Sequence, residues 1–141
     1  MQPKWKLVEK IETKVKTIET RFYKLKAKPW NLVKVGESIF FKESGKSIYL
    51  KAKVLKVEQY ENLDLASSLK LIATAGKANI GITSKEMEII MEAHLTGKKY
   101  AILIWLTEVE KVEPFNISKA GFGAMASWIC VENIEKVKIL I

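Results

Sequence analysis

The first segment of the chain carries apolar residues at helical spacing, yet its second half has the composition of a strand. Apolar side chains recur every three or four positions from Leu7 to Phe22, which is the period of an amphipathic helix. Residues 17–23, however, are rich in β-branched and aromatic side chains, which favour a strand. We therefore predict a helix over about 3–13 and a strand over about 16–24.

The following segment has the period-two alternation of a hairpin. From Ile48 to Val54 apolar residues alternate with a tyrosine and two lysines, which is typical of a sheet with one solvent-exposed face. We predict strands over 38–43 and 47–60, joined by a turn at Ser44, Gly45 and Lys46.

Two helices are predicted in the middle of the chain, over 63–75 and 84–96. We expect the second to begin with a capping box formed by Thr83 and Glu86 and to stop at Gly97. After it we predict strands over 99–112, 127–132 and 135–140, with the segment Pro114–Gly123 as a loop. Strands from both ends of the chain around two central helices predict an α+β fold, a mixed β-barrel with helices at its side or mouth.

The composition fits one domain, residues 1–141, and excludes several kinds of site. The single cysteine, Cys130, excludes an internal disulfide and a multi-cysteine zinc site. His94 is the only histidine, so we expect no metal and no cofactor. No apolar run approaches the roughly 18 residues of a spanning helix, and we therefore expect a cytoplasmic protein with no membrane partner. The sequence leaves the oligomeric state open, and we favour a monomer.

The positive charge lies in the first part of the chain. The net charge is +8, and residues 1–56 carry 15 Lys or Arg against 5 Glu, a net of +10, whereas residues 57–141 have a net of −2. Such polarity is expected of a protein that binds phosphate groups. Lysine-rich solvated faces are equally typical of heat-adapted proteins, whose enrichment in Lys and Glu this composition resembles. Charge alone leaves both interpretations open.

The most informative string is Lys16-x-x-Glu19-x-Arg21. On a strand beginning near Thr17, Glu19 and Arg21 project from one face, and Lys16 lies at the corner between helix and strand. Charged side chains inside a sheet are costly to desolvate, so they must pair, reach a cleft or contact a ligand. Lys16 and Arg21 would then hold a phosphate or a base edge, with Glu19 orienting one of them. The alternative is an ion-pair network that only closes the barrel.

This string, between a short helix and a strand, resembles the signature of the ASCH (activating signal cointegrator homology) domain, a branch of the PUA-like superfamily. Two downstream segments, Val35–Gly45 and Lys51–Val54, are similar to the strands that follow in that family. The signature usually begins with Gly two residues before the lysine, and this chain has Lys14 there. The EVE domain, a sister group, is an alternative assignment.

The resemblance implies a PUA-like β-barrel of five to six strands with two to three flanking helices, and a role in RNA binding or RNA modification. Some bacterial ASCH proteins are amidohydrolases that remove the acetyl group from acetylcytidine, and others have been proposed as ribonucleases. The catalytic lysine of the amidohydrolases matches Lys16. Their threonine three residues later corresponds to Glu19, so the match is incomplete.

Other candidate RNA-binding residues lie in loops. Trp30 offers a stacking platform for a base or a plug for one end of the barrel. Lys42 and Ser44, near the first hairpin turn, would reach phosphate or form a solvated turn. Lys119 and Phe122, in a Gly-x-Gly context, would contact a ligand or form a tight turn around a core phenylalanine.

Three functions therefore compete. The first is a non-catalytic RNA-binding domain with a basic cleft, the interpretation that we favour. The second is a small hydrolase acting on a modified nucleoside, with Lys16 and Glu19 as catalytic residues. The third is an interaction domain for a protein partner, in which the basic half serves only solubility.

Overall fold

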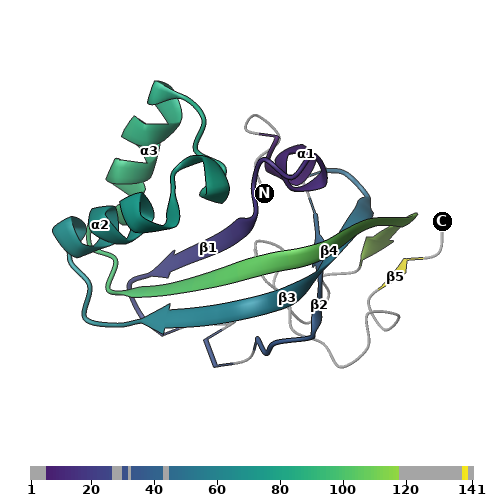
Figure 1. Ribbon diagram of the computed structural model, residues 1–141, viewed down its shortest axis with the longest axis horizontal. Coiled ribbons are helices and arrows are strands. Elements are labelled where there is room, and N and C mark those ends of the chain that lie inside the picture. Colours follow the sequence, from purple (N-terminus) through teal and green to yellow (C-terminus); the bar gives the residue numbers. More distant parts are fainter. Residues whose placement is uncertain (1–5, 27–29, 32, 43–44, 118–137, 140–141) are drawn as a thin grey trace.

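The structure is a computed structural model, which describes residues 6–26, 30–31, 33–42, 45–117 and 138–139. The elements in chain order are α1 (Leu7–Glu12), β1 (Ile18–Tyr23), β2 (Ser38–Phe41), β3 (Ile48–Tyr60), α2 (Leu65–Ala75), the 3-10 turn η2 (Ala78–Ile80), α3 (Lys85–Leu95), β4 (Tyr100–Ile117) and β5 (Lys138–Ile139), as Figure 1 shows. The predicted α+β class is confirmed. The predicted strand over 127–132 and Cys130 lie outside the described residues.

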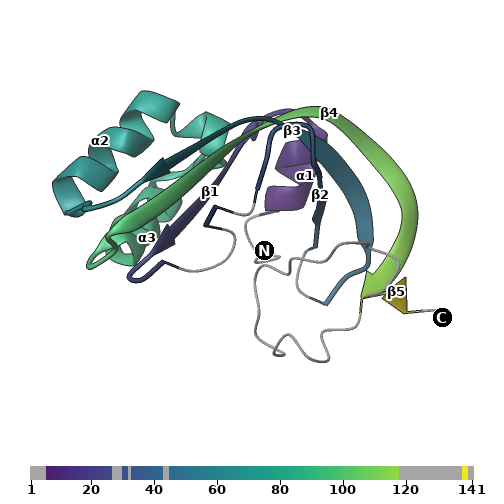
Figure 2. The ribbon, with the colours of Figure 1, turned by 90° about the horizontal axis from the view of Figure 1, so that it is seen from below.

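The strands form an antiparallel sheet in the order β1-β4-β3-β2, and β5 pairs with the far end of β4. In this order β1 and β2 lie at opposite edges, so the described strands form a curved, open sheet. The barrel of five to six strands that the family resemblance implies stays a prediction. Figure 2 shows the curvature. The pairing of β3 with β4 shifts register at three places along β3, and such irregularities bend and twist a strand.

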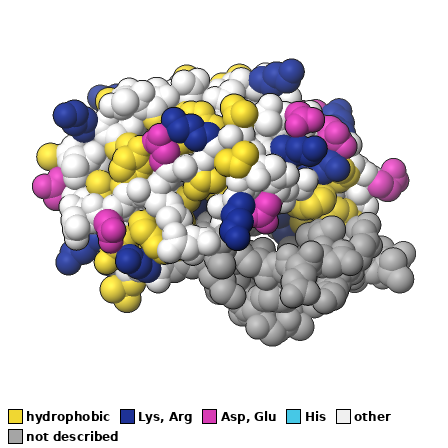
Figure 3. All heavy atoms as spheres, turned by 60° about the horizontal axis from the view of Figure 1, so that its bottom comes forward, with side chains coloured by type: hydrophobic (Ala, Val, Ile, Leu, Met, Phe, Trp, Pro, Cys, Tyr) yellow, Lys and Arg dark blue, Asp and Glu magenta, His cyan; other side chains and the backbone are white. Residues whose placement is uncertain are grey.

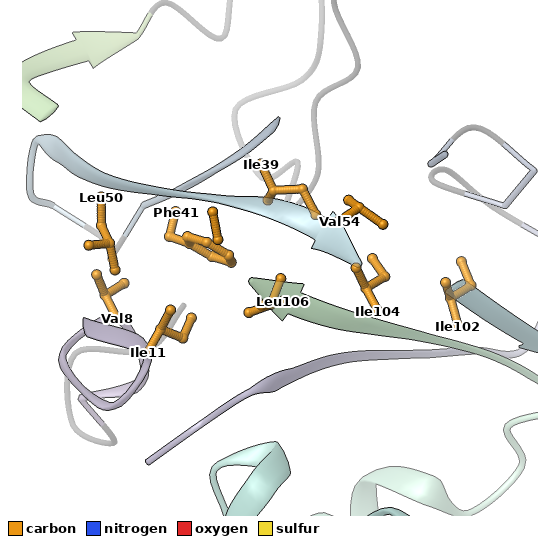
Figure 4. Close-up of a cluster of buried hydrophobic side chains, with 10 residues drawn as sticks. Val8, Ile11, Ile39, Phe41, Leu50, Val54, Ile102, Ile104 and Leu106 are labelled. Atoms are coloured by element: carbon orange, nitrogen blue, oxygen red, sulfur yellow. The ribbon is translucent and has the colours of Figure 1, made fainter. Parts of the chain in front are cut away.

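Alternation along β4 divides the core between the two faces of the sheet. Ile102, Ile104 and Leu106 belong to a cluster on what we call the inner face, together with side chains from α1, β2 and β3. Figure 4 shows Val8 and Ile11 of α1 directed toward this cluster, and Figure 2 shows α1 within the curve of the sheet.

The outer face carries a separate core. Ala101 and Leu103, which alternate with the inner-face residues of β4, pack there with Ile18 and Phe22 of β1 and with apolar side chains of α2, η2 and α3. Figure 1 shows α2 and α3 together beside β1, away from α1. The sheet therefore has apolar cover on both faces over part of its area, which fits the continuous apolar run 101–106 of β4.

Each of the two longer helices begins with a side-chain cap. The sequence pattern did not predict the cap of α2 and misplaced that of α3. The Asp64 carboxylate accepts a hydrogen bond from Ser67 N at 2.7 Å, and the Ser67 hydroxyl oxygen accepts one from Asp64 N at 2.9 Å, so a capping box opens α2. At α3 the predicted box of Thr83 and Glu86 is wrong by one residue, because Ser84 is the N-cap and accepts from Met87 N at 3.2 Å. Thr83 and Ser84 are both good caps, and only backbone geometry distinguishes them.

The largest error of prediction concerns the end of β4. The sequence placed a loop from Pro114, whereas β4 continues to Ile117. Lys111 pairs with Leu50 and Phe115 with Ile48, so three residues of β4, including Pro114, lie opposite one residue of β3. Proline is tolerated in such a bulge because no ladder bond is required from its nitrogen.

The remaining boundaries differ by a few residues. The helix predicted over 3–13 is α1, Leu7–Glu12, and the strand predicted over 16–24 is β1, Ile18–Tyr23. The strand predicted over 135–140 is described only at β5. No helix in the part of the chain that the structure describes is long and apolar enough to cross a bilayer.

Candidate functional site

Lys16 is held inside the molecule at the junction of α1 and β1. Its side chain is 2% exposed, and Nζ donates hydrogen bonds to Ile18 O and Ile80 O, each at 2.8 Å. Burial lowers the pKa of Lys16, an effect that the nearby Glu19 carboxylate opposes and that Arg21 and Lys10 reinforce. The amino group thus fixes η2 against the beginning of β1.

Glu19 and Arg21 project from the inner face of β1. Their Cα partners on β4 are Ile104 and Ile102, which lie in the inner-face core, and directly opposed residues share a face. Glu19 Oε1 lies 3.9 Å from Lys16 Nζ and 4.0 Å from Arg21 Nε, and it accepts a hydrogen bond from Thr20 N at 3.1 Å. The three charged side chains of the sequence motif are therefore together.

The second oxygen of Glu19 is the unusual feature of this group. Glu19 is 5% exposed, and its Oε2 is buried without a hydrogen-bond partner among the described residues. A buried carboxylate oxygen that accepts no hydrogen bond is costly. Glu19 Oε2 therefore keeps its capacity to accept a hydrogen bond, in a carboxylate that lies beside two cationic groups.

The three charges differ in access. The Arg21 side chain is 20% exposed, against 2% for Lys16, so Arg21 is the member of the group that solvent reaches. We expected Lys16 to contact a ligand together with Arg21. In this structure the Lys16 amino group points into the molecule, because it donates hydrogen bonds to two backbone carbonyl oxygens. There it forms an ion pair with Glu19.

Sequence reasoning missed the segment that buries Lys16. Gly81, directly after η2, has φ 94°, and a Cβ at this position would lie 2.9 Å from Leu7 Cδ2 and 3.1 Å from Lys16 Cδ. Only glycine combines this backbone with this close approach. Lys10 adds a further bond, since its Nζ donates to Gly81 O at 3.1 Å. The available signal was the apolar string Ile80-Gly81-Ile82, in which glycine interrupts two buried isoleucines.

The structure brings one predicted loop residue toward β1 and separates another. Trp30 is half-buried and meets the Tyr100 ring edge-on, with centroids 5.5 Å apart. Lys42 follows β2, at the opposite edge of the strand order from β1, and is half-buried. Ser44, Lys119 and Phe122 lie outside the described residues.

The described residues provide no group of three or more His, Cys, Asp or Glu side chains that would hold a metal ion. The charged group at β1 contains one carboxylate and two cations, a composition that suits an anion or a hydrogen-bond donor better than a cation.

Comparison of the fold with solved structures gives three related matches. The crystal structure of ASCH from Zymomonas mobilis matches with a TM-score of 0.53 and 17% identity, covering 81% of this chain and 68% of that one. A serine-to-alanine variant and a tyrosine-to-phenylalanine variant of the same protein match with TM-scores of 0.55 and 0.52, at 16% and 18% identity. The chain has the ASCH fold. No protein-family model matches the sequence, and no curated protein matches it significantly.

The backbone at Lys14, where the chain departs from the signature that it resembles, has a conformation typical of glycine. The signature has glycine two residues before its lysine, and the residue here, Lys14, has φ 64°. This is the left-handed region that glycine adopts without cost and other residues adopt with strain. The backbone therefore follows the path that glycine permits, and Lys16 N closes the turn by donating to Lys10 O at 2.9 Å.

Proposed function

We propose that this chain is an RNA-binding domain, in which Glu19 and Arg21 contact a base and Lys16 positions Glu19. The observation that carries the proposal is the Glu19 Oε2 atom, a buried acceptor without a donor among the described residues, beside a partly exposed arginine. The likeness of fold to ASCH proteins supports the same conclusion, because the sequence resemblance to that family implies a role in RNA binding.

The chemistry of a base edge fits this group. An amino or imino N–H of a base satisfies a carboxylate oxygen, as Glu does with the N4 amino group of cytosine. The guanidinium of Arg21 offers donors in a fixed planar fork, which suits the carbonyl oxygen or ring nitrogen of the same base or an adjacent phosphate. Bases are accessible in this way only in single-stranded or looped RNA.

The net charge of +8 supports binding to a polyanion, but the lysines are not gathered in one area of the surface. Figure 3 shows a face on which Lys and Arg side chains lie among Asp and Glu side chains, not in one continuous basic area. Several lysines of β3 are paired, for example Lys51 with Glu110 at 3.3 Å and Lys53 with Glu108 at 3.9 Å. We therefore attribute phosphate binding to lysines outside these cross-strand pairs.

The finer features of the proposal follow from the sequence. We propose that the sheet closes into a PUA-like barrel, that Trp30, Lys42, Ser44, Lys119 and Phe122 border the RNA, and that the protein acts as a cytoplasmic monomer. These positions are to be tested by substitution once binding has been measured.

The test is the affinity for labelled single-stranded RNA, measured by fluorescence anisotropy over a range of salt. Hydrogen bonds to charged groups contribute about 1.5–3 kcal/mol, so Glu19→Gln is expected to weaken binding by roughly 10- to 100-fold. Glu110→Gln, which changes an exposed carboxylate on β4, is the matched control and should bind as the parent does. Equal affinity of all three proteins, or no RNA binding by the parent, would reject the proposal.

A hydrolase acting on a modified nucleoside is the second candidate, and one observation favours it. Burial lowers the pKa of Lys16, which increases the fraction of neutral, nucleophilic amine. Against it, the Lys16 amino group is 2% exposed and engaged by two carbonyl oxygens. Incubation of the parent protein with acetylcytidine decides the matter: release of cytidine that is proportional to the amount of folded protein supports catalysis, and no release by the parent removes it.

A further inference from the structure

A second group of side chains lies where β1 ends and β4 begins, and it combines aromatic rings with lysines. Tyr23 and Tyr100 are Cα partners at this end of the ladder. Trp30 meets the Tyr100 ring edge-on, with an interplanar angle of 75°. All three residues are half-buried, so each keeps part of its surface in solvent.

One lysine lies over these rings, and two more are next to the tyrosines in the sequence. Lys26 Nζ lies 5.5 Å from the centroid of Trp30 and 5.8 Å from that of Tyr100, within the range of a cation–π interaction. Lys24 and Lys99 are exposed, and neither forms an ion pair with a described residue. Lys24 lies beside Gly97, since a Cβ on that glycine would be 3.6 Å from Lys24 Cε.

Glu61, the acidic residue beside Lys26, would compete only weakly with a phosphate group for this lysine. Glu61 lies 3.5 Å from Lys26, but both side chains are more than half exposed, and exposed pairs contribute little. A phosphate group that approaches Lys26 therefore displaces little stabilising interaction. With Lys24, Lys26 and Lys99 against Glu61, this end of the sheet keeps a positive excess.

The aromatic group is continuous with the site at Glu19. Glu19 and Arg21 lie on the inner face of β1, and Tyr23, two residues further, packs against the same inner-face core. Trp30 packs against that core as well. Two residues span about 6.8 Å along an antiparallel strand, so Arg21 and the tyrosine are neighbours on one strip of surface.

We propose that this strip is the path of a single RNA strand, with one base at Glu19 and Arg21, the next stacked on Tyr23, Trp30 or Tyr100, and the backbone phosphates at Lys24, Lys26 and Lys99. The inference rests on the proposed function and extends it, because it makes the ligand an oligonucleotide and not a free nucleoside. Aromatic rings bind any unpaired base by its flat face, whereas paired bases in a duplex are stacked on one another and unavailable.

The test compares affinities for oligocytidylates of increasing length, from the mononucleotide upward, measured by fluorescence anisotropy or calorimetry. We expect affinity to rise over the first few nucleotides. Trp30→Leu retains an apolar side chain but removes stacking, and should weaken oligonucleotide binding by roughly 5- to 100-fold, with little effect on the mononucleotide.

The matched control is Trp105→Leu. Trp105 is also half-buried and also lies under a lysine, Lys56, at 4.6 Å, but it packs against the outer-face core. For the lysines, Lys24→Gln with Lys99→Gln should reduce the slope of log affinity against log salt by about 1.4, since each phosphate contact of a single strand contributes about 0.7. Lys70→Gln with Lys85→Gln, on α2 and α3, should leave the slope unchanged.

The outcomes separate the two proposals. If Glu19→Gln weakens binding of the mononucleotide, while Trp30→Leu and the Lys24 and Lys99 variant bind oligonucleotides as the parent does, the strand path is wrong and the base site stands. If the aromatic and lysine variants lose affinity and Glu19→Gln does not, the base site is wrong. Thermal unfolding of each variant checks that Trp30→Leu remains folded.

Discussion

The amino group of Lys16 donates a 2.8 Å hydrogen bond to the carbonyl oxygen of Ile80, sixty-four positions later in the chain. This contact joins the start of β1 to η2, the turn between the two longer helices. Because the same amino group lies 3.9 Å from Glu19, the position of the candidate base-binding carboxylate depends on the packing of η2. Lys16 therefore contributes both to the packing of η2 and to the position of Glu19.

Replacing Lys16 by methionine should destabilise the fold severely. Lys16→Met keeps the apolar stem but removes the donor from two carbonyl oxygens and one of the two cations beside the buried Glu19 carboxylate. Breaking a buried charged pair in this way costs about 3–5 kcal/mol in the free energy of unfolding. Urea denaturation measures it, with Lys70→Met as an exposed control. The double variant Lys16→Met with Glu19→Gln should lose less than the sum of the single variants, because the two groups interact.

Glycine at position 14 should stabilise the protein. Lys14 has φ 64°, a conformation that costs a residue with a Cβ about 1–2 kcal/mol. After the greater entropy of glycine in the unfolded chain is subtracted, a gain of about 0.5–1 kcal/mol remains. The control is Glu9→Gly, inside α1, which should be destabilising. A loss of stability in Lys14→Gly would show that the lysine side chain outweighs its backbone strain.

Adjacent hydroxyl residues before α3 should respond differently to substitution. Ser84 accepts a hydrogen bond from Met87 N and is the N-cap, so Ser84→Ala should lower the free energy of unfolding by about 1 kcal/mol. Thr83→Ala removes no cap and should cost less. Equal effects in thermal or urea unfolding would contradict the assigned start of this helix.

Ionisation of Tyr60 should weaken the fold at alkaline pH. Burial, with a hydrogen bond to Glu58 and the charge of that carboxylate, raises the pKa of Tyr60 to about 12 from 10. The folded chain therefore retains a proton that the unfolded chain has lost, so this contribution to stability is complete below pH 10 and falls as pH rises toward 12. Tyr60→Phe should remove that component, together with the latest step in the tyrosinate absorbance titration. A titration that is unchanged by the substitution would refute the assignment.

The part of the site that sequence predicted well is the part governed by strand alternation. Glu19 and Arg21 are two residues apart in a β-rich segment, so period two alone places them on one face. The corner position of Lys16 followed from the change of period after the first helix. No long-range information was needed for either.

The burial of Lys16 could not be predicted, because it depends on a distant segment. Its carbonyl partner Ile80 and the close approach of Gly81 belong to η2, a short turn with no periodic pattern of its own. The aromatic group also required the fold, since Tyr23 and Tyr100 become neighbours only through the β1–β4 register. For the same reason Pro114 predicted a loop: its place in a bulge is determined by the pairing of β4 with β3.

The central claim is that the buried oxygen of Glu19 receives its hydrogen bond from an RNA base. A crystal structure of the protein with a short oligocytidylate tests it most directly. We predict a base amino nitrogen at about 2.9 Å from Glu19 Oε2, with Arg21 on the same nucleotide. If Oε2 instead accepts its bond from a donor of the protein, and the RNA lies elsewhere, the account is contradicted.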